Sequence, residues 1–259
     1  MLVTTEMGRH GVAKLFAGWA DTMVQSYLGG CMGHALVDNE ESPAAGAIVV
    51  GDFAMAAGRA DPALLDIPPH CHPNDALLIV PGSDDWAQCI QARFGADCQS
   101  FQRYAIRRQA QFDLPRLRGF ANSLPQGYHM TMLDRGLYAQ VMATPWAQDF
   151  CSLFADCDDY LARGLGVAVF HGRELVAGAS SYSVFPGGIE IEIDTREDHR
   201  QRGLVTACGA RLMLEALERG LYPNWDAADL RSVALAEKLG YQLDHPYLTY
   251  RVSLPRAGC

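Results

Sequence analysis

The chain has 259 residues, of which 49% are apolar and 20% charged, and this composition is typical of a globular protein that can bury a core without covalent staples. A formal charge of −9 argues against a general nucleic-acid-binding surface, because phosphate backbones are bound by clustered Lys and Arg. No apolar run approaches the roughly 20 residues that a membrane span needs, and residues 1–10 lack the features of a signal peptide. The sequence therefore predicts a soluble protein with no nucleic-acid or membrane partner.

Eight cysteines form neither a C-x-x-C pair nor the regular spacing of a disulfide framework. Several lie within apolar helical patterns, which favours buried, reduced thiols and predicts a cytoplasmic location. The run His70-Cys71-His72 carries metal-capable atoms, but neighbouring strand residues point in opposite directions and no matching fourth ligand follows. A surface loop is favoured there, and no metal is expected.

The first half of the chain has the pattern of an α/β domain. Apolar residues at spacings of three and four mark its first helix, which Gly29-Gly30 ends, and Gly95 is suited to stop the second. Short apolar runs bounded by turn residues mark the strands. The predicted elements are, in order, a helix over 9–28, strands over 46–57 and 76–80, a helix from Asp84 to about Phe94, and a strand over 101–107.

The succession of strand, helix, glycine and strand near 76–107 has a counterpart at 221–252, where Asp226 is predicted to cap a helix that Gly240 ends. A degenerate first copy of the same half-domain is therefore one hypothesis for the N-terminal half. Two prolines and mixed charges favour a boundary within residues 109–125. The sequence predicts an N-terminal α/β domain over 1–120 and a second domain over 126–259.

Short turns at residues 171–174 and 186–188 join three predicted strands of the second half and favour antiparallel pairing between them. A helix over 204–219 must then cross over to a strand over 221–225, which requires a parallel step. Charged residues on one face of that helix predict a solvated surface: Arg211, Glu215, Glu218 and Arg219. The predicted fold class is α/β (α+β), with a mixed, largely antiparallel sheet flanked by helices.

The most informative segment is the alternating strand over 189–195, which leads through the turn Arg200-Gln-Arg-Gly203-Leu-Val205 into that helix. Free backbone N–H groups and the positive end of a helix dipole are suited to bind an anion there. Gly203 permits close approach, and Arg200 and Arg202 add positive charge. The segment predicts a site for a phosphate-bearing cofactor; a plain strand-to-helix turn is the alternative. His199 either contacts phosphate or is exposed.

This arrangement resembles the GNAT superfamily of acetyl-CoA-dependent N-acetyltransferases, whose pyrophosphate loop reads R/Q-x-x-G-x-G/A. Arg200, Gly203 and Val205 occupy the three pattern positions, with Val205 in place of the usual small residue. Downstream, residues 225–232 and 234–241 are similar to the N-x-x-S…L-x-x-K-x-G-F helix of the superfamily. The resemblance covers residues 126–259, and the first half is similar to the subgroup that includes zwittermicin A resistance acetyltransferases.

The resemblance implies a GNAT-type sheet and acetyl-CoA as the co-substrate. Backbone amides of the loop would cradle the pyrophosphate, and the end of the alternating strand would pair with the pantetheine arm. The implied cofactor-binding residues are Ile193, Asp194, Thr195, Arg200, Gln201, Arg202, Gly203, Leu204, Val205, Thr206 and Ser232. Asp229 replaces the asparagine of the family, either as an anion that repels phosphate or as part of a helix cap.

Acetyl transfer to an amine requires a base, because an alkyl ammonium with a pKa of about 10.4 is only about one part in 10³ deprotonated at neutral pH. Strand alternation places Glu190, Glu192 and Asp194 on one face, where mutual repulsion raises at least one pKa. Glu192 is the preferred base and Glu190 the second, because superfamily bases often lie on this strand. A bulge in the strand would reverse the order, and a merely solvated acidic face is the alternative.

Ala236 stands where many family members have the tyrosine that protonates the departing thiolate. Tyr241, Tyr247 or water would then supply the proton, unless the thiolate leaves unprotonated. The sequence predicts direct transfer of an acetyl group, within a ternary complex, to a primary amine of a small molecule. The alternatives are an acyl-CoA-binding regulatory or degenerate module without turnover, and a protein or peptide N-acetyltransferase. A homodimer is compatible with the sequence.

Overall fold

The computed structural model describes residues 2–3, 8–72 and 76–254 of the chain. The chain divides into two compact units. Unit 1 comprises Met1–Arg103 and Pro246–Cys259, and unit 2 comprises Tyr104–His245. Within the described ranges, none of the helices combines the length and hydropathy needed to cross a lipid bilayer.

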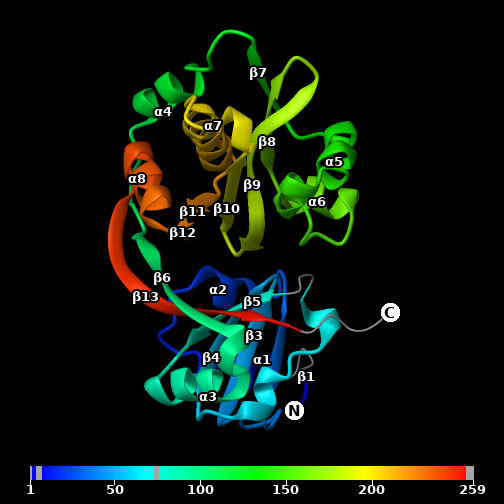
Figure 1. The fold of residues 1–259 in the computed structure, drawn as a ribbon, viewed down its shortest axis with the longest axis vertical. Coiled ribbons are helices and arrows are strands. Elements are labelled where there is room, and N and C mark those ends of the chain that lie inside the picture. Colours follow the sequence, from blue (N-terminus) through cyan, green and yellow to red (C-terminus); the bar gives the residue numbers. More distant parts are fainter. Residues whose placement is uncertain (1, 4–7, 73–75, 255–259) are drawn as a thin grey trace. The chain divides into compact units, whose positions relative to one another are not determined.

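Unit 1 is built from a sheet with helices on it (Figure 1). Its elements are β1 (Leu2–Val3), α1 (Arg9–Leu15), α2 (Thr22–Leu28), β2 (His34–Val37), β3 (Ala45–Val50), β4 (Phe53–Gly58), the short 3-10 helices η1 (Pro62–Leu65) and η2 (Pro69–Cys71), β5 (Ala76–Pro81), α3 (Asp84–Phe94), η3 (Gly95–Asp97) and β6 (Cys98–Arg107). Strands β1 to β4 pair antiparallel in chain order, and β4 pairs parallel with β5.

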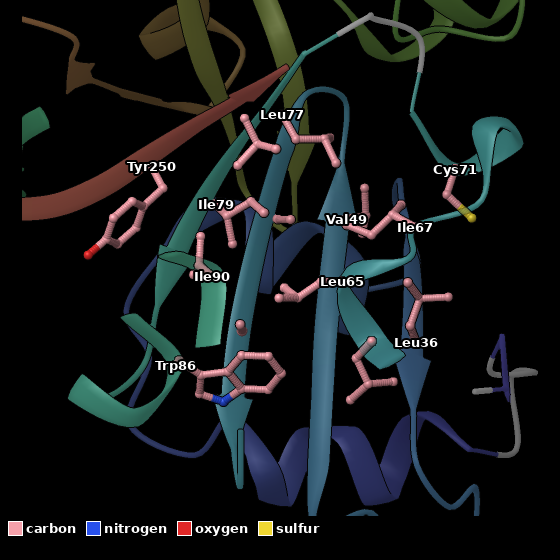
Figure 2. Packing of buried hydrophobic residues seen from close by; sticks show 14 of the residues in the cluster. Leu36, Val49, Leu65, Ile67, Cys71, Leu77, Ile79, Trp86, Ile90 and Tyr250 are labelled. Carbon is pink, nitrogen blue, oxygen red and sulfur yellow. The ribbon is translucent and has the colours of Figure 1, made fainter. Parts of the chain in front are cut away.

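The core of unit 1 lies between this sheet and helix α3 (Figure 2). Trp86 and Ile90 of α3 are fully buried there beside Ile79 of β5. The indole Nε1 of Trp86 donates a 3.0 Å hydrogen bond to the carbonyl of Gly58, so this large ring is buried without leaving its polar atom unsatisfied. Tyr250, from the other end of the chain, belongs to the same cluster.

Two predicted elements of this half are each divided in the structure. The helix expected over 9–28 is interrupted, because Gly18 adopts a left-handed conformation and the Asp21 carboxylate caps a new helix at the N–H of Met23. The strand expected over 46–57 is a hairpin, β3 and β4, that turns at Gly51 with a positive φ. In both places turn and cap chemistry prevails over the hydrophobic period.

Unit 2 carries a five-stranded sheet in the order β11-β10-β9-β8-β7. Its elements are α4 (Leu114–Ala121), β7 (Tyr128–Met132), α5 (Arg135–Met142), η4 (Pro145–Phe150), α6 (Cys157–Arg163), β8 (Gly166–His171), β9 (Glu174–Phe185), β10 (Gly188–Thr195), η5 (Glu197–His199), α7 (Leu204–Glu218), β11 (Tyr222–Asn224), β12 (Asp226–Ala227), α8 (Leu230–Leu239) and the start of β13 (Gln242–Ser253), whose residues from Pro246 onward belong to unit 1. Strands β7 to β10 pair antiparallel and β10 pairs parallel with β11, so the predicted mixed, largely antiparallel sheet is confirmed.

Helices cover both faces of the unit 2 sheet, with α7 on one face and α5 and α6 on the other (Figure 1). Ile193 of β10 lies toward α7, because a Cβ added at Gly209 would approach its side chain to 3.1 Å. On the other face, a Cβ added at Gly178 of β9 would approach the ring of Phe150 in η4 to 2.5 Å. Alternate residues of β10 therefore point into two different environments.

Helix α8 starts later than the sequence predicts. Asp229 is the residue before its first turn, and the carboxylate of Asp229 accepts 2.9 Å hydrogen bonds from the N–H groups of Arg231 and Ser232. Asp226, the predicted cap, lies in β12 and pairs with Ala105 of β6. Asp229 therefore caps the helix, because Asp226 is held in a strand.

Strands β6 and β13 each contribute residues to both units. The C-terminal part of β13 pairs antiparallel with β5, where Tyr250 lies opposite Ile79, and the C-terminal part of β6 pairs antiparallel with β12. A strand, a helix and a glycine with positive φ, Gly95 or Gly240, precede each of these two strands. The internal repeat itself stays a hypothesis.

Candidate active site

The turn between β10 and α7 presents a row of backbone N–H groups. Gln201 has a φ of 62° and Gly203 a φ of 79°, and α7 begins directly afterwards. The first helical hydrogen bond runs from the N–H of Ala207 to the carbonyl of Gly203 at 3.1 Å. Within the part of the chain that the structure describes, the N–H groups from Gln201 through Thr206 have no acceptor. Such a run of free donors at a helix start suits an anion.

Gly203 is required by its backbone conformation rather than by space. A Cβ added there would meet no atom within 4 Å, but the left-handed φ is one that residues with side chains rarely adopt. Gln201 adopts the left-handed region although it is not glycine, a conformation that persists only when the surroundings hold it.

The two arginines of the turn fold back onto it. Arg200 Nε donates to the carbonyl of Thr195 at 3.2 Å. Arg202 donates from Nη2 to the carbonyl of Asp198 and from Nη1 to Tyr128 Oη, both at 3.1 Å. The guanidinium groups thus brace the turn while they keep positive charge beside the row of N–H groups.

Strands β10 and β11 are paired over only part of the length of β10. They pair only from Gly188 to Glu190, opposite Tyr222 to Asn224, where β11 ends, whereas β10 continues to Thr195. Among the described residues, Ile191 to Thr195 pair with β9 alone, so the other edge of β10 offers unpaired backbone groups. An extended ligand can hydrogen-bond to such an edge as an added strand does.

Strand β10 keeps its alternation through a register shift. Glu190 lies opposite Ser183 and Ile191 opposite Ser181, so the extra residue, Tyr182, belongs to β9. The bulge that would have exchanged the roles of the two glutamates is therefore in the neighbouring strand. Glu190, Glu192 and Asp194 share the face opposite α7.

The three carboxylates of this face have different surroundings. Glu190 is only 3% exposed and its Oε2 accepts a 2.7 Å hydrogen bond from Asn224 Nδ2, at the last residue pair before β10 and β11 separate. Glu192 is half-buried and lies opposite Ser180. The Oδ1 atom of Asp194 lies 3.9 Å from Arg200 Nη2 and accepts a hydrogen bond from the N–H of Thr195.

Ser232 and Asp229 stand at the start of α8. Ser232 Oγ accepts a 3.0 Å hydrogen bond from Trp225 Nε1, which leaves its own hydroxyl hydrogen for another acceptor. Burial alone would raise the pKa of Asp229, but hydrogen bonds from Arg231 and from the Ser232 N–H outweigh it and lower that pKa. Of the two interpretations of Asp229, the helix cap describes its contacts, and Arg231 balances its charge.

Tyr241 is unsuited to protonate a leaving thiolate. Its Oη donates a 2.6 Å hydrogen bond to the carbonyl of Pro223, and burial raises the pKa of its phenol well above the ordinary value. The hydroxyl is thus both occupied and weakly acidic. Tyr247, the other tyrosine that the sequence offers, belongs to unit 1.

Three polar side chains lie near the turn, and Lys238 is the one among them that was not predicted from the sequence. Lys238 of α8 donates a 3.3 Å hydrogen bond from Nζ to Thr206 Oγ1 in the first turn of α7. Thr195 Oγ1 is buried and has no partner among the described residues. His199, expected either to touch phosphate or to be exposed, is buried. Lys238 could have been found from the L-x-x-K-x-G motif; the burial of His199 had no signal in the sequence.

Other candidate features have structural explanations. The seven cysteines that the structure describes are free thiols, and Cys259 lies outside the described residues. No group of three or more metal-capable side chains occurs within 2–3, 8–72 and 76–254. The charged face of α7 is exposed at Arg211, Glu218 and Arg219, Arg211 is ion-paired with Glu215, and both residues of this pair line a groove of about 560 Å³ against α4. That groove includes neither β10 nor the turn.

Comparisons with known proteins identify the family. A family model described as GNAT acetyltransferase matches residues 13–250. A Bacillus subtilis (strain 168) protein named "Uncharacterized N-acetyltransferase YdfB" is 26% identical over 170 residues, a match that covers 65% of this chain and 63% of that protein.

Solved structures agree with this assignment. A GCN5-related N-acetyltransferase-like protein from Streptococcus suis 89/1591 is 38% identical with a TM-score of 0.89, and the alignment covers 95% of this chain and 98% of that one. A tandem GNAT protein from the clavulanic acid biosynthesis pathway is 10% identical with a TM-score of 0.56, covers 97% and 96% of the two chains, and shows the fold alone. The family model spans most of the chain, including the β10–α7 turn, and the chain belongs to the GNAT acetyltransferase family.

Proposed function

We propose that this protein transfers an acetyl group from acetyl-CoA to a primary amine of a small molecule, by direct attack within a ternary complex. The observation that carries the proposal is the row of unpaired N–H groups from Gln201 through Thr206, beside the one-sided edge of β10, in a chain of the GNAT family. A diphosphate needs such donors, and a pantetheine amide needs such an edge.

Acetyl-CoA supplies the activated thioester. The N–H groups of the turn would bind its diphosphate, with Arg200 and Arg202 adding charge, and the backbone of Ile193 to Thr195 would pair with the pantetheine arm. The free hydroxyl hydrogen of Ser232 would bind a further acceptor of the cofactor. Val205 would contact the diphosphate only through its backbone N–H, so a side chain larger than that of the usual small residue does not remove this donor.

Glu192 is the proposed base. Its neighbour Glu190 is buried against Asn224, whereas Glu192 is half-buried on the same face, beyond the point where β10 and β11 separate. Glu192 takes a proton from the substrate ammonium, directly or through water, and the nitrogen lone pair then attacks the thioester carbonyl. The attacking nitrogen then loses its second proton to water, the C–S bond breaks, and the electron pair of that bond leaves with sulfur. Because Tyr241 is occupied, solvent protonates the thiolate after it departs.

A small acceptor is favoured by the acidic face of β10, which attracts an ammonium group. The resemblance of the N-terminal half to the subgroup with zwittermicin A resistance acetyltransferases suggests an aminated natural product. Two alternatives remain as outcomes of experiment. Val205, Asp229 and Ala236 depart from the family pattern, as an acyl-CoA-binding module without turnover would. A protein acetyltransferase would act on peptides instead.

Release of free thiol from acetyl-CoA across a panel of small amines and peptides tests this proposal. We expect turnover with a small amine, and Gly203→Arg should abolish it, because a side chain at φ 79° distorts the turn. Gly187→Arg is the matched control, since Gly187 has a φ of 80° and open space but lies in the turn between β9 and β10.

Binding without turnover would favour the regulatory module. CoA at 100 times its Kd should stabilise the protein by about 2.7 kcal/mol, which thermal unfolding detects whether or not thiol is released. Turnover with peptides alone would favour the protein acetyltransferase. Absence of both CoA binding and thiol release would overturn the proposed function.

A further inference from the structure

A buried histidine lies directly before the anion-binding turn. His199 is 7% exposed, and both of its ring nitrogens have partners: Nδ1 lies 2.8 Å from Tyr128 Oη, and Nε2 lies 3.0 Å from Arg196 Nη2. The Tyr128 ring also contacts the ring of His171, with 4.9 Å between their centroids. We call Tyr128, His171, Arg196, His199 and Arg202 the His199 cluster.

The contacts of His199 define where its proton lies. A guanidinium group has only donors, so Nε2 must accept from Arg196. In the neutral imidazole the proton is then on Nδ1, and Nδ1 donates to Tyr128 Oη. Arg196 also binds the carboxylates of Asp198 and Glu174, which balance its charge.

The hydroxyl oxygen of Tyr128 also contacts a residue of the turn. Tyr128 Oη accepts a second hydrogen bond, from Arg202 Nη1 at 3.1 Å. Arg202 stands between Gln201 and Gly203, the two residues of the turn with positive φ. Its side chain therefore links the left-handed part of the turn to β7, and a strained non-glycine residue such as Gln201 needs a link of this kind.

We propose that Tyr128 and His199 are positioning residues for the anion-binding turn, which hold the Gln201–Gly203 backbone through Arg202 so that its N–H groups converge on a diphosphate. This inference rests on the proposed function of the turn. Neither residue touches the cofactor. The hydroxyl of Tyr128 orients Arg202, and His199 fixes the position of that hydroxyl.

Binding of three probes to Tyr128→Phe tests the role of the hydroxyl. The variant keeps the ring beside His171 and removes only Oη. We expect the Kd for CoA and for dephospho-CoA, which both contain the diphosphate, to rise about tenfold, the effect of losing one charge-assisted hydrogen bond. The Kd for pantetheine, which lacks the diphosphate, should not change. Calorimetry measures all three.

Tyr222→Phe is the matched control, because Tyr222 Oη accepts a 2.8 Å hydrogen bond from the N–H of Gln109, away from the turn. It should lower thermal stability about as much as Tyr128→Phe does and leave the preference for CoA over pantetheine intact. An equal loss of CoA and pantetheine affinity in Tyr128→Phe, or no loss of either, would overturn the inference.

Two variants of His199 test the roles of its two ring nitrogens separately. The amide nitrogen of His199→Asn can replace Nδ1 as donor to Tyr128, so this variant should keep CoA affinity within about threefold. His199→Gln can offer an oxygen to Arg196 in place of Nε2 but loses the bond to Tyr128, and it should weaken CoA binding about tenfold. The opposite order would overturn the inference.

A measurement without ligand distinguishes this inference from the proposed function. Long-range ¹⁵N–¹H NMR correlations of His199 should place the proton of the neutral form of the ring on Nδ1, and a neutral form with its proton on Nε2 would overturn the inference. Wild-type protein that does not discriminate CoA from pantetheine would overturn the proposed function. Wild-type discrimination that Tyr128→Phe leaves unchanged would overturn the positioning role alone.

Discussion

At the scale of single residues, the contacts of neighbouring side chains decide which can react. Glu190 and Glu192 share one face of β10, yet Glu190 accepts a hydrogen bond from Asn224 in a buried position and Glu192 is half-buried. This difference is the reason for proposing Glu192 ahead of Glu190 as the base. Tyr241 shows the same effect, because a buried hydrogen bond to Pro223 removes it from acid chemistry.

Glu192→Gln should lower kcat by about 10²-fold with little change in the KM for acetyl-CoA, because the amide cannot accept a proton. Glu190→Gln should have a smaller effect, since its amide oxygen can still accept the hydrogen bond from Asn224. Rates of thiol release from pH 6 to 9 measure both. An unchanged rate in Glu192→Gln over this range would remove Glu192 from the mechanism.

Cys208 should contribute a pH dependence to stability. Burial raises the pKa of its thiol from 9.0 to about 12 in the folded protein. A raised pKa gives stability that is fully present below the unfolded value and is lost as pH rises toward the folded one, so urea midpoints should fall above about pH 9. The urea midpoint of the Cys208→Ala variant should fall less steeply with rising pH.

The remaining slope in Cys208→Ala comes from other buried groups, among them Cys151, Tyr160 and Tyr241, whose pKa values burial also raises. Alkylation at pH 8 is an independent check. Cys208 and Cys151 should resist iodoacetamide in the folded protein, whereas the partly exposed Cys31 and Cys157 should react. Equal reactivity of all four would contradict the burial.

At the scale of elements, the site is built from the ends of helices and strands. Helix α7 begins with free N–H groups because a left-handed glycine, not a capping side chain, precedes it. Helix α8 begins with a capping aspartate, and its Lys238 reaches the first turn of α7. Strand β10 outlasts β11 and so keeps one edge open.

Asp229→Ala should destabilise the protein by about 1 kcal/mol, because the N–H groups of Arg231 and Ser232 lose their acceptor. Asp229→Asn should cost little, since asparagine caps helices as well as aspartate does. Urea unfolding at pH 7 distinguishes the two variants. Equal stability of Asp229→Ala and wild type would show that the cap contributes nothing.

At the scale of the whole molecule, β13 lies in the same sheet as the strands that open the chain, where it pairs with β5. Residues of β13 fill the core of unit 1, where Tyr250 is 2% exposed and Val252 is fully buried beside β5. The Tyr250 hydroxyl accepts a 2.8 Å hydrogen bond from Gln91 of α3. Unit 1 is therefore incomplete until the last strand of the chain exists.

Truncation after His245 should unfold unit 1, because it removes Tyr250 and Val252 and leaves the edge of β5 unpaired. Limited proteolysis should then cut within residues 8–103 far faster than in the full chain. Truncation after Leu254 is the matched control, since it keeps both buried residues. Equal protease resistance of the two truncated proteins would contradict this dependence.

Features that depend on local chemistry were predictable from the sequence. The alternation of β10, the glycine turn before α7 and the short hairpins require only neighbouring residues, and they were sufficient to predict the fold class and the family. Errors arose where two local signals competed, as at Gly18 and Asp21, which divide the first predicted helix. Asp226 and Asp229 were both possible caps, and pairing with β6 decided between them.

The sequence by itself determined the strand, turn and helix that form the candidate cofactor site, because the tolerance of Gly203 for positive φ and the alternation of side chains along a strand are properties of the local sequence. Only the tertiary structure decided that β13 pairs with β5, that Asn224 donates a hydrogen bond to Glu190, and that the Tyr128 hydroxyl is hydrogen-bonded to both His199 and Arg202. Each of these contacts links residues far apart in the chain, and their meeting depends on how the strands assemble into sheets.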